Sequence, residues 1–538
     1  MLASAAAALY FHRLGSATPY LAVEERTQAR ESVLLALTGR NGDDERHPMY
    51  FPEADYRPGR DPAWVYVGAA LLKVRPFSER VVRSPSAAAA VLNVVLMFLV
   101  GEELFGSTIA AVCAAVLLAL TPAHFIHGRI ATAQITVVTT TLAWLWLLLR
   151  YLNRHRLWNL IFATVCLGAG AYFYLGAWIS IPAFFAVTVI AVVGRKRTGP
   201  RLRTELFAAI AGVAAVVLPL IIWHVFHPGR IAQLAGYYNT RDQAVNLGLR
   251  PAIAHINYWW TAFNPDPMFF SGESDYRFST RTAGYFLLAL ALPMLAGLWS
   301  NRYGSDSMGR RVALCGFVLG PFPAAVGSNI DLKHWLTFLP FAICVAIAGA
   351  RWMIAGGRAA GRFAAVGLPL IVRWVVPWPA WLLVLAAAGL WLLAGRRGAG
   401  IVCAAILAST VGLQASSFFR YYFEDYGPNT AVMFGGNLSG AVRAALSVTG
   451  PHDCIRIDDR IYDIRGAWAL YSRAYRREDL TDSPDGLGPD PDASWDASCR
   501  GATVVTAAGD RRFADWQTIE VPEPGRPAQI AVYHRGLR

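Results

Sequence analysis

The chain carries few charged residues for its length. Of 538 residues, only 16% are charged and 55% are hydrophobic, and the mean hydropathy is +0.37. A soluble globule of this size needs more polar surface than these residues supply. The composition therefore excludes a soluble globular protein and predicts a multi-pass membrane protein.

Cysteine is also scarce, and its spacing matches no metal site. Most of the 7 cysteines lie inside apolar runs, where cysteine usually acts as a small hydrophobic residue. The sequence has no CxxC motif and no Cys/His zinc spacing, so we expect no metal and no cofactor. Cys454 and Cys499 lie instead in a polar C-terminal region, where an oxidising compartment would favour a disulfide between them. The N-terminal apolar segment also lacks the basic start of a secretory signal.

Apolar runs fill most of residues 1–420. Together with the N-terminal segment they predict an all-α polytopic domain with about thirteen transmembrane helices, although several runs are shorter than the roughly 20 residues that a crossing needs. The runs cover residues 85–100, 108–120, 135–149, 157–174, 177–193, 206–223, 285–299, 312–326, 335–348, 364–376, 378–394 and 401–413.

Short basic loops predict the orientation in the plasma membrane. If each run crosses once, the basic loops within residues 150–156, 195–203, 302–311, 351–362 and 396–397 share one side. Lys and Arg resist translocation, so this side is the cytoplasm. A net charge of +13 that is scattered over such loops does not indicate nucleic-acid binding.

The opposite, extracytoplasmic side receives the large polar segments, which are residues 15–83 and 224–281. A connector at 421–448 then leads to a small soluble α/β domain at 449–538. Within that domain the patterns predict strands at 453–458, 502–507 and 529–534, a helix at 461–475 and a loop at 481–494.

An acidic doublet, Glu24-Glu25, lies in the first polar segment, and a series of short motifs follows it. The motifs are Gly39, Pro62-Ala-Trp64-Val-Tyr66, Arg83-Ser-Pro85-Ser86, Leu104-Phe105-Gly106, the set Pro122, His124 and Arg129, Phe263-Asn-Pro265 and Gly272-Glu273. In this order they resemble the GT-C class of membrane glycosyltransferases, particularly the bacterial protein O-mannosyltransferase and lipid A aminoarabinose transferase group (glycosyltransferase families 39 and 83). The resemblance covers most of the first 430 residues.

The resemblance implies a GT-C fold and an inverting transfer of a sugar from a polyprenyl-phosphate donor. The acceptor would be an extracytoplasmic protein, lipid or cell-wall glycan. Glu24 and Glu25 become the catalytic candidates, because a carboxylate must accept the proton of the acceptor. Without the resemblance, the doublet reads as a favourable interaction with a helix dipole and solvent. The family usually has Asp at the first of these two positions, and it has an Arg-bearing segment where this chain has Lys333-His334-Trp335.

Cations on the extracytoplasmic side are candidates for binding the donor phosphate. They are Arg83, Arg129, Lys333 and His334. The alternative for each of them is that it only anchors a helix end at the membrane interface. Candidates for substrate contact are His124, Tyr66, Trp259 and Trp260. For the two tryptophans, the alternative is an interfacial aromatic belt.

Two other functions stay open at this point, a transporter or lipid flippase and a non-catalytic relative of the transferases. Transporters place ionisable residues near the middle of the membrane and pair broken helices in two related halves. In this chain the ionisable residues gather in loops, which favours the transferase.

Overall fold

The computed structural model describes residues 1–51, 61–195, 199–230, 256–300, 308–323, 331–355, 363, 367, 396–477, 480, 484–488, 495 and 498–536. Two predicted crossings, at 364–376 and 378–394, lie almost entirely outside the described residues, as do parts of the basic loops and of the predicted loop 481–494.

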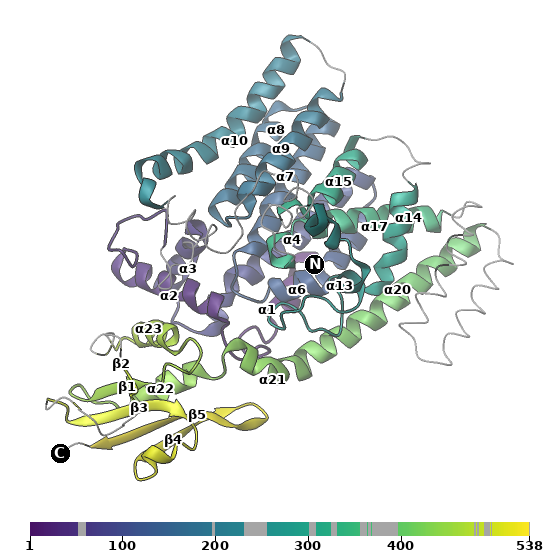
Figure 1. Cartoon of the computed structure of the whole chain (residues 1–538). Helices are drawn as coiled ribbons and strands as arrows, with labels where there is room; N and C mark the ends of the chain where they lie inside the picture. Colours follow the sequence, from purple (N-terminus) through teal and green to yellow (C-terminus); the bar gives the residue numbers. More distant parts are fainter. Residues whose placement is uncertain are drawn as a thin grey trace. The chain divides into compact units, whose positions relative to one another are not determined.

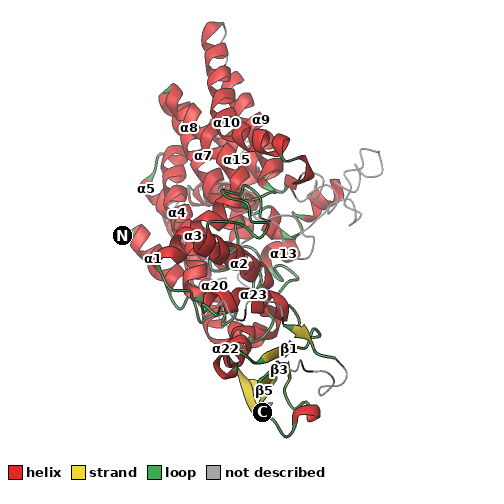
Figure 2. Ribbon diagram, turned by 90° about the vertical axis from the view of Figure 1, so that its left-hand side faces the viewer, coloured by secondary structure: helices red, strands yellow, loops and turns green. Residues whose placement is uncertain are grey.

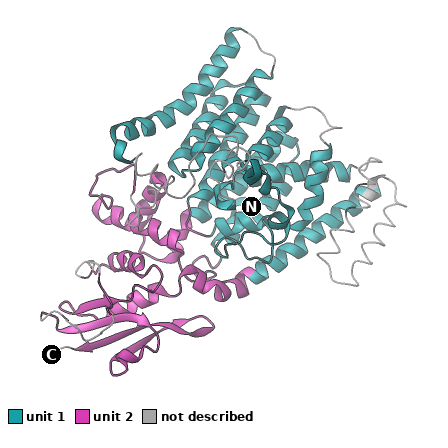
Figure 3. Ribbon diagram, viewed as in Figure 1, with its two compact units in different colours: residues 1–12, 86–129, 133–421 teal, residues 13–85, 130–132, 422–538 magenta. Residues whose placement is uncertain are grey.

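The chain divides into two compact units, which we treat separately (Figure 3). Unit 1 comprises Met1–His12, Ser86–Arg129 and Ala133–Tyr421. Unit 2 comprises Arg13–Pro85, Ile130–Thr132 and Tyr422–Arg538. The first polar segment therefore groups with the C-terminal region, although the two are more than 300 residues apart in the sequence.

Unit 1 is built from helices, seen in Figure 1. They are α1 (Leu2–Phe11), α4 (Glu79–Phe105, which begins in unit 2), α5 (Thr108–Leu120), α6 (Pro122–His127), α7 (Gln134–Arg154), α8 (Leu157–Ala169), α9 (Ala177–Val193), α10 (Pro200–Phe226), α13 (Pro265–Phe269), α14 (Ala291–Ser300), α15 (Met308–Leu319), α17 (Phe338–Ile354) and α20 (Arg396–Tyr421), with short 3₁₀ turns η1 (Gly170–Tyr172), η2 (Leu288–Leu290) and η3 (Leu332–His334).

Four helical segments of the described chain are long and apolar enough to cross a membrane: 79–105, 134–154, 200–226 and 400–434. Eight further apolar helices are shorter. The multi-pass helical architecture is therefore confirmed, whereas the thirteen crossings stay a prediction, and so does the orientation in the membrane.

Close helix packing in unit 1 depends on small residues. A Cβ added at Gly349 of α17 would lie 1.9 Å from the Pro293 carbonyl oxygen of α14. A Cβ at Gly212 of α10 would lie 2.7 Å from the Ile161 carbonyl oxygen of α8. Neither position accepts a side chain without moving the backbone, so glycine allows these helices to approach as membrane helices often do.

Unit 2 combines the first polar segment with a small sheet (Figure 2). Its helices are α2 (Val23–Thr38), α3 (Pro62–Val74), α21 (Gly427–Thr430), α22 (Leu438–Val448) and α23 (Ile464–Ala474), with a π-helical turn η4 (Tyr422–Tyr426) and 3₁₀ turns η5 (Ala431–Phe434) and η7 (Arg511–Phe513). Its strands are β1 (Cys454–Ile457), β2 (Asp485–Gly486), β3 (Gly501–Ala507), β4 (Gln517–Glu523) and β5 (Arg526–Gly536).

The sheet has the order β2-β1-β3-β5-β4. β1 runs parallel to β2 and β3, while β5 pairs antiparallel with β3 and β4. A small C-terminal sheet domain with the three predicted strands and the predicted helix is therefore confirmed, while its bounds at 449–538 stay a prediction. Two strands were not predicted. β2 has only two residues and lies in the predicted loop 481–494. The exposed residues of β4 and Pro522 hide the alternation of an edge strand.

A disulfide joins Cys454 to Cys499, with their Cα atoms 5.5 Å apart. It ties the start of β1 to the segment that precedes β3. The sequence prediction for these two cysteines is confirmed.

The hydrophobic core of unit 2 joins its two stretches of sequence. Leu21, Ala29 and Val33 from the start of the chain are buried together with Leu438 and Trp468 from its C-terminal part. Helix α2, which carries the acidic doublet, is thus held by the C-terminal domain.

Candidate functional site

Helix α2 places both carboxylates of the doublet in its first turn. Glu25 Oε2 accepts a hydrogen bond from the Ala22 backbone N–H at 2.8 Å, which caps the helix. The helix ends at Gly39, whose φ of 72° gives the left-handed turn that a glycine adopts most readily. The acidic pair also complements the positive end of the helix dipole.

Glu25 is completely buried and forms an ion pair with Arg83. Its Oε1 accepts from Arg83 Nε at 2.8 Å and from the Ala131 backbone N–H at 2.7 Å. Its Oε2 accepts from Arg83 Nη2 at 2.9 Å. Both side chains are 0% exposed, so the pair fixes α2, the start of α4 and the 130–132 segment to one another within unit 2.

Arg83 has no unused donor in this arrangement. Besides Glu25, its guanidinium donates to the backbone carbonyls of Leu14, Thr18 and Tyr20. These bonds account for all five N–H groups of an arginine. To bind a phosphate, Arg83 would therefore have to exchange at least one of them, and its phosphate role stays a prediction.

Glu24 differs from its neighbour in exposure. It is half-buried, whereas Glu25 is fully enclosed. A substrate can reach only a carboxylate that is not enclosed by the protein. The structure thus separates the two members of the doublet: Glu25 holds the backbone and is fully buried, whereas Glu24 is half-buried.

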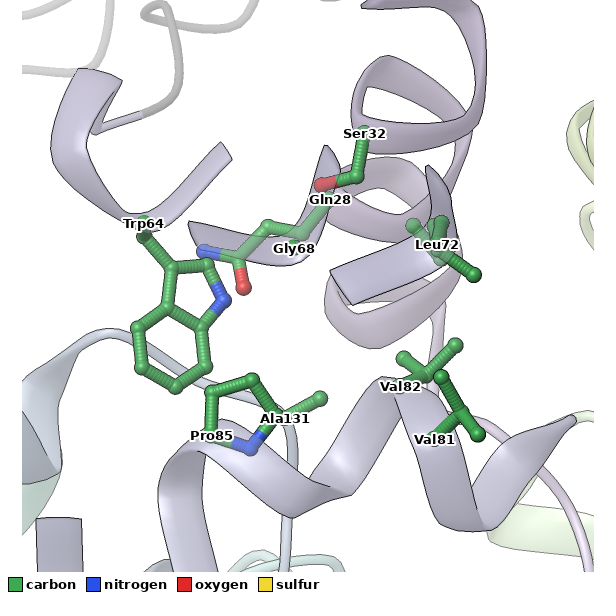
Figure 4. A pocket seen from close by; sticks show the side chains of 10 residues that line it. Gln28, Ser32, Trp64, Gly68, Leu72, Val81, Val82, Pro85 and Ala131 are labelled. Carbon is green, nitrogen blue, oxygen red and sulfur yellow. The ribbon is translucent and has the colours of Figure 1, made fainter. Parts of the chain in front are cut away.

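A small cavity lies one turn further along α2 (Figure 4). Gln28, Ser32, Trp64 and Pro85 are among its lining residues, and its volume of about 20 Å³ has room for one water molecule. Gln28 is 5% exposed and its Oε1 has no hydrogen-bond partner among the described residues. A water molecule in this cavity would satisfy it.

Tyr66 on α3 is occupied by contacts within unit 2. Its hydroxyl donates to the Pro48 carbonyl at 3.1 Å, and its ring meets the edge of Phe51. The structure shows the side chain supporting the 48–51 segment, and its contact with substrate stays a prediction.

Sequence reasoning missed a second anchor of α2, Arg26. This residue is 2% exposed, and its Nε donates to Asp463 Oδ2 at 2.6 Å. Its Nη1 donates to the Phe434 carbonyl at 3.0 Å. An arginine directly after an acidic doublet was the only sequence signal, because Asp463 and Phe434 lie more than 400 residues away.

In unit 1, His124 and Arg129 hold the connection after α5 against α1. His124 Nδ1 lies 2.6 Å from the Tyr10 hydroxyl and its Nε2 lies 3.2 Å from Asn93 Nδ2. Burial lowers the pKa of His124 to about 3, so the ring is neutral. Arg129 is 1% exposed, donates to the Tyr10 carbonyl at 2.7 Å and stacks over Phe125.

Lys333 belongs to a polar cluster of unit 1. Nothing in the sequence indicated that its members lie together. The Lys333 ammonium lies 3.4 Å from Asp331 and 5.0 Å from the centre of the Phe278 ring. His127 stacks on the same ring. Burial, together with the charge of Lys333, lowers the pKa of His127 to about 4.

Glu273 is the most enclosed acid near this cluster. It is 3% exposed, and neither carboxylate oxygen has a hydrogen-bond partner among the described residues. Burial, and after it Asp331, raises the pKa of Glu273 to about 8. The sequence showed this acid only as part of a Gly-Glu motif.

The remaining candidates of unit 1 have separate surroundings. His334 bonds to the Tyr174 hydroxyl through Nδ1, and burial lowers its pKa to about 4. Trp259 donates to the Val318 carbonyl at 2.8 Å, while Trp260 is 66% exposed. Their roles in phosphate and substrate binding stay predictions.

Comparison with known proteins shows the fold. The family model described as dolichyl-phosphate-mannose-protein mannosyltransferase matches residues 57–223. The structure resembles ArnT from Cupriavidus metallidurans bound to undecaprenyl phosphate, with a TM-score of 0.58 at 13% identity, over 99% of this chain and 97% of that one. The apo state of the same ArnT gives a TM-score of 0.52 at 14% identity over the same shares. No curated protein sequence matches the chain.

These matches agree with the motifs in the sequence. The chain has the fold of the GT-C class of membrane glycosyltransferases, with a small C-terminal sheet domain.

Proposed function

We propose that this protein is a plasma-membrane glycosyltransferase that moves a sugar from a polyprenyl-phosphate donor to an extracytoplasmic acceptor. The match of residues 57–223 to a family of dolichyl-phosphate-mannose transferases supports a lipid-phosphate-linked donor. The fold of an ArnT that was solved with undecaprenyl phosphate supports it as well.

The observation that carries the proposal is that the two carboxylates of the acidic doublet differ in burial and in their contacts. Glu25 is locked by Arg83 and two backbone amides, which fixes the first turn of α2. Glu24 sits in the same turn but is only half-buried. A carboxylate at a rigid helix end that is not fully buried meets the requirements for a positioned general base.

In the proposed reaction an acceptor hydroxyl or amine attacks the anomeric carbon of the donor sugar. The bond between that carbon and the phosphate oxygen breaks, and its electron pair leaves with the polyprenyl phosphate. The acceptor proton passes to Glu24. Lys333 is the proposed cation for the charge that grows on the leaving phosphate.

A deletion strain tests this function in the cell. Mass spectrometry of envelope glycans, lipids and glycoproteins should show one sugar missing without the gene. Wild-type protein should restore it, and Glu24→Gln at equal membrane abundance should not. Restoration by Glu24→Gln would remove Glu24 from the mechanism. An unchanged envelope in the deletion strain would count against the function itself.

A further inference from the structure

A polar groove opens on unit 2 between the C-terminal half of α2, the turn that follows it, and α23. Its volume is about 460 Å³, within the usual range of ligand pockets. Its charged lining residues are Arg30, Glu31, Arg40, Asp43, Asp44 and Arg473.

A buried carboxylate, that of Glu31, lies in the wall of the groove. Glu31 is 2% exposed, and its Oε1 accepts from Arg30 Nη2 at 3.1 Å. Its Oε2 has no hydrogen-bond partner among the described residues. An enclosed carboxylate oxygen without a donor is costly unless something supplies one. Burial accordingly raises the pKa of Glu31, and the charge and hydrogen bond of Arg30, the charge of Arg473 and the nearby backbone N–H of Gly42 only partly oppose this.

The rim of the groove is already ordered. Asn41 Oδ1 accepts from the backbone N–H groups of Asp43 and Glu45 at 3.1 and 2.9 Å, and its Nδ2 donates to the Tyr50 carbonyl. Arg40 Nη1 donates to Asp44 Oδ2 at 2.6 Å. A ligand would meet a turn that is fixed before binding, which lowers the entropy cost of complex formation.

The charges in the groove indicate the chemistry of its ligand. Three arginines, Arg30, Arg40 and Arg473, face three carboxylates, Glu31, Asp43 and Asp44, so the formal charges cancel. An anionic or cationic ligand would meet as much repulsion as attraction. A neutral ligand with many hydroxyl groups, each both donor and acceptor, fits arginine and carboxylate side chains equally well.

The position of the groove along α2 indicates whether such a ligand is part of the donor or of the acceptor. Glu31 follows Glu24 by seven residues, which places both on one face of the helix at a separation of about 10 Å. The donor sugar must react at the base itself. A saccharide bound two turns away therefore belongs to the acceptor.

We propose that this groove binds the non-reacting sugar units of an acceptor glycan. Glu31 Oε2 accepts a hydrogen bond from a sugar hydroxyl group, and Arg473 donates hydrogen bonds to hydroxyl oxygens. This inference rests on the proposed transferase function. It assigns the acceptor to the class of neutral oligosaccharides, free or carried on a lipid or protein.

The test uses the full-length protein in lipid nanodiscs on an array of neutral and anionic glycans of one to four sugars. Wild type should bind at least one neutral glycan of two or more units. Glu31→Gln and Arg473→Ala should each weaken that binding about tenfold or more, the effect of losing one hydrogen bond to a charged group. Arg460→Ala, which alters an arginine with a side chain 78% exposed in the same unit, is the matched control and should bind as wild type does.

A second measurement separates failure of the groove inference from failure of the proposed function. Undecaprenyl phosphate is added to the same nanodiscs, and its binding is measured as an increase in Tm. If it stabilises wild type and both groove variants while no neutral glycan binds, the groove inference fails and the transferase proposal stands. Glycan binding that survives both groove substitutions also overturns the inference. If the lipid phosphate does not bind wild type at all, the proposed function itself is contradicted.

Discussion

Replacement of Glu25 by glutamine is expected to destabilise unit 2 strongly, although it changes a single charge. Glu25 and Arg83 are both 0% exposed, so water cannot take over the lost interaction. Glutamine would also turn an amide donor toward the Arg83 donors or toward the Ala22 and Ala131 amides that now bond to Glu25. Removal of one partner from a buried ion pair typically costs about 3–5 kcal/mol, because the other charge stays buried and unpaired.

The measurement is the apparent Tm of purified protein in detergent, followed by loss of soluble protein after stepwise heating. For a domain the size of unit 2, each kcal/mol shifts Tm by about 2–4 °C. Glu25→Gln should therefore melt at least about 6 °C below wild type.

Glu24→Gln is the matched control, since it makes the same substitution one residue earlier on a half-buried side chain. Its Tm should stay within about 2 °C of wild type, as expected away from buried interactions. The double variant Glu25→Gln with Arg83→Met should recover part of the loss, because no unpaired charge stays buried. A Glu25→Gln protein that melts together with wild type would refute the structural role of this pair.

Three further predictions concern other parts of the chain. Folding raises the pKa of Glu273 from 4.5 to about 8, so the contribution of this residue to stability is full below pH 4.5 and is lost as the pH rises to 8. Glu273→Gln should therefore raise the apparent Tm relative to wild type at pH 8 but not at pH 4.5. Equal gains at both pH values would contradict this. Changing Cys454 and Cys499 to serine opens a loop with a sequence separation of 45 and should cost about 2–4 kcal/mol, seen as a lower Tm that reducing agent no longer affects. Lys333→Ala should raise the KM for a polyprenyl-phosphate donor about tenfold with unchanged protein abundance, whereas an unchanged KM would exclude Lys333 from phosphate binding.

The sequence predicted those features that depend on local pattern. Continuous apolar runs indicated the helices, and alternation indicated the strands around 454–457, 501–507 and 526–536. Cys454 and Cys499 were identified because they alone lie outside the apolar runs. The edge strand β4 was missed because its pattern is polar and broken by Pro522.

The candidate site was predictable only in part, because its side chains are held in place by residues that lie far away in the sequence. The doublet was evident, but nothing in the sequence indicates that Arg83 would bury and pair with Glu25 while Glu24 stays half-buried. The unsatisfied oxygen of Glu31 depends on the packing of α23, which lies in the C-terminal domain. Local pattern carries no information on such pairings.

The central claim is that Glu24 serves as the base in sugar transfer from a lipid phosphate. The most direct measurement is release of undecaprenyl phosphate from a panel of undecaprenyl-phosphate sugars, by wild type and Glu24→Gln in proteoliposomes that contain envelope extract as acceptor. The account predicts sugar-bearing product with wild type and a rate about 10²- to 10⁴-fold lower for a folded Glu24→Gln protein. Equal rates for the two proteins, or no release by wild type from any donor of the panel, would contradict it.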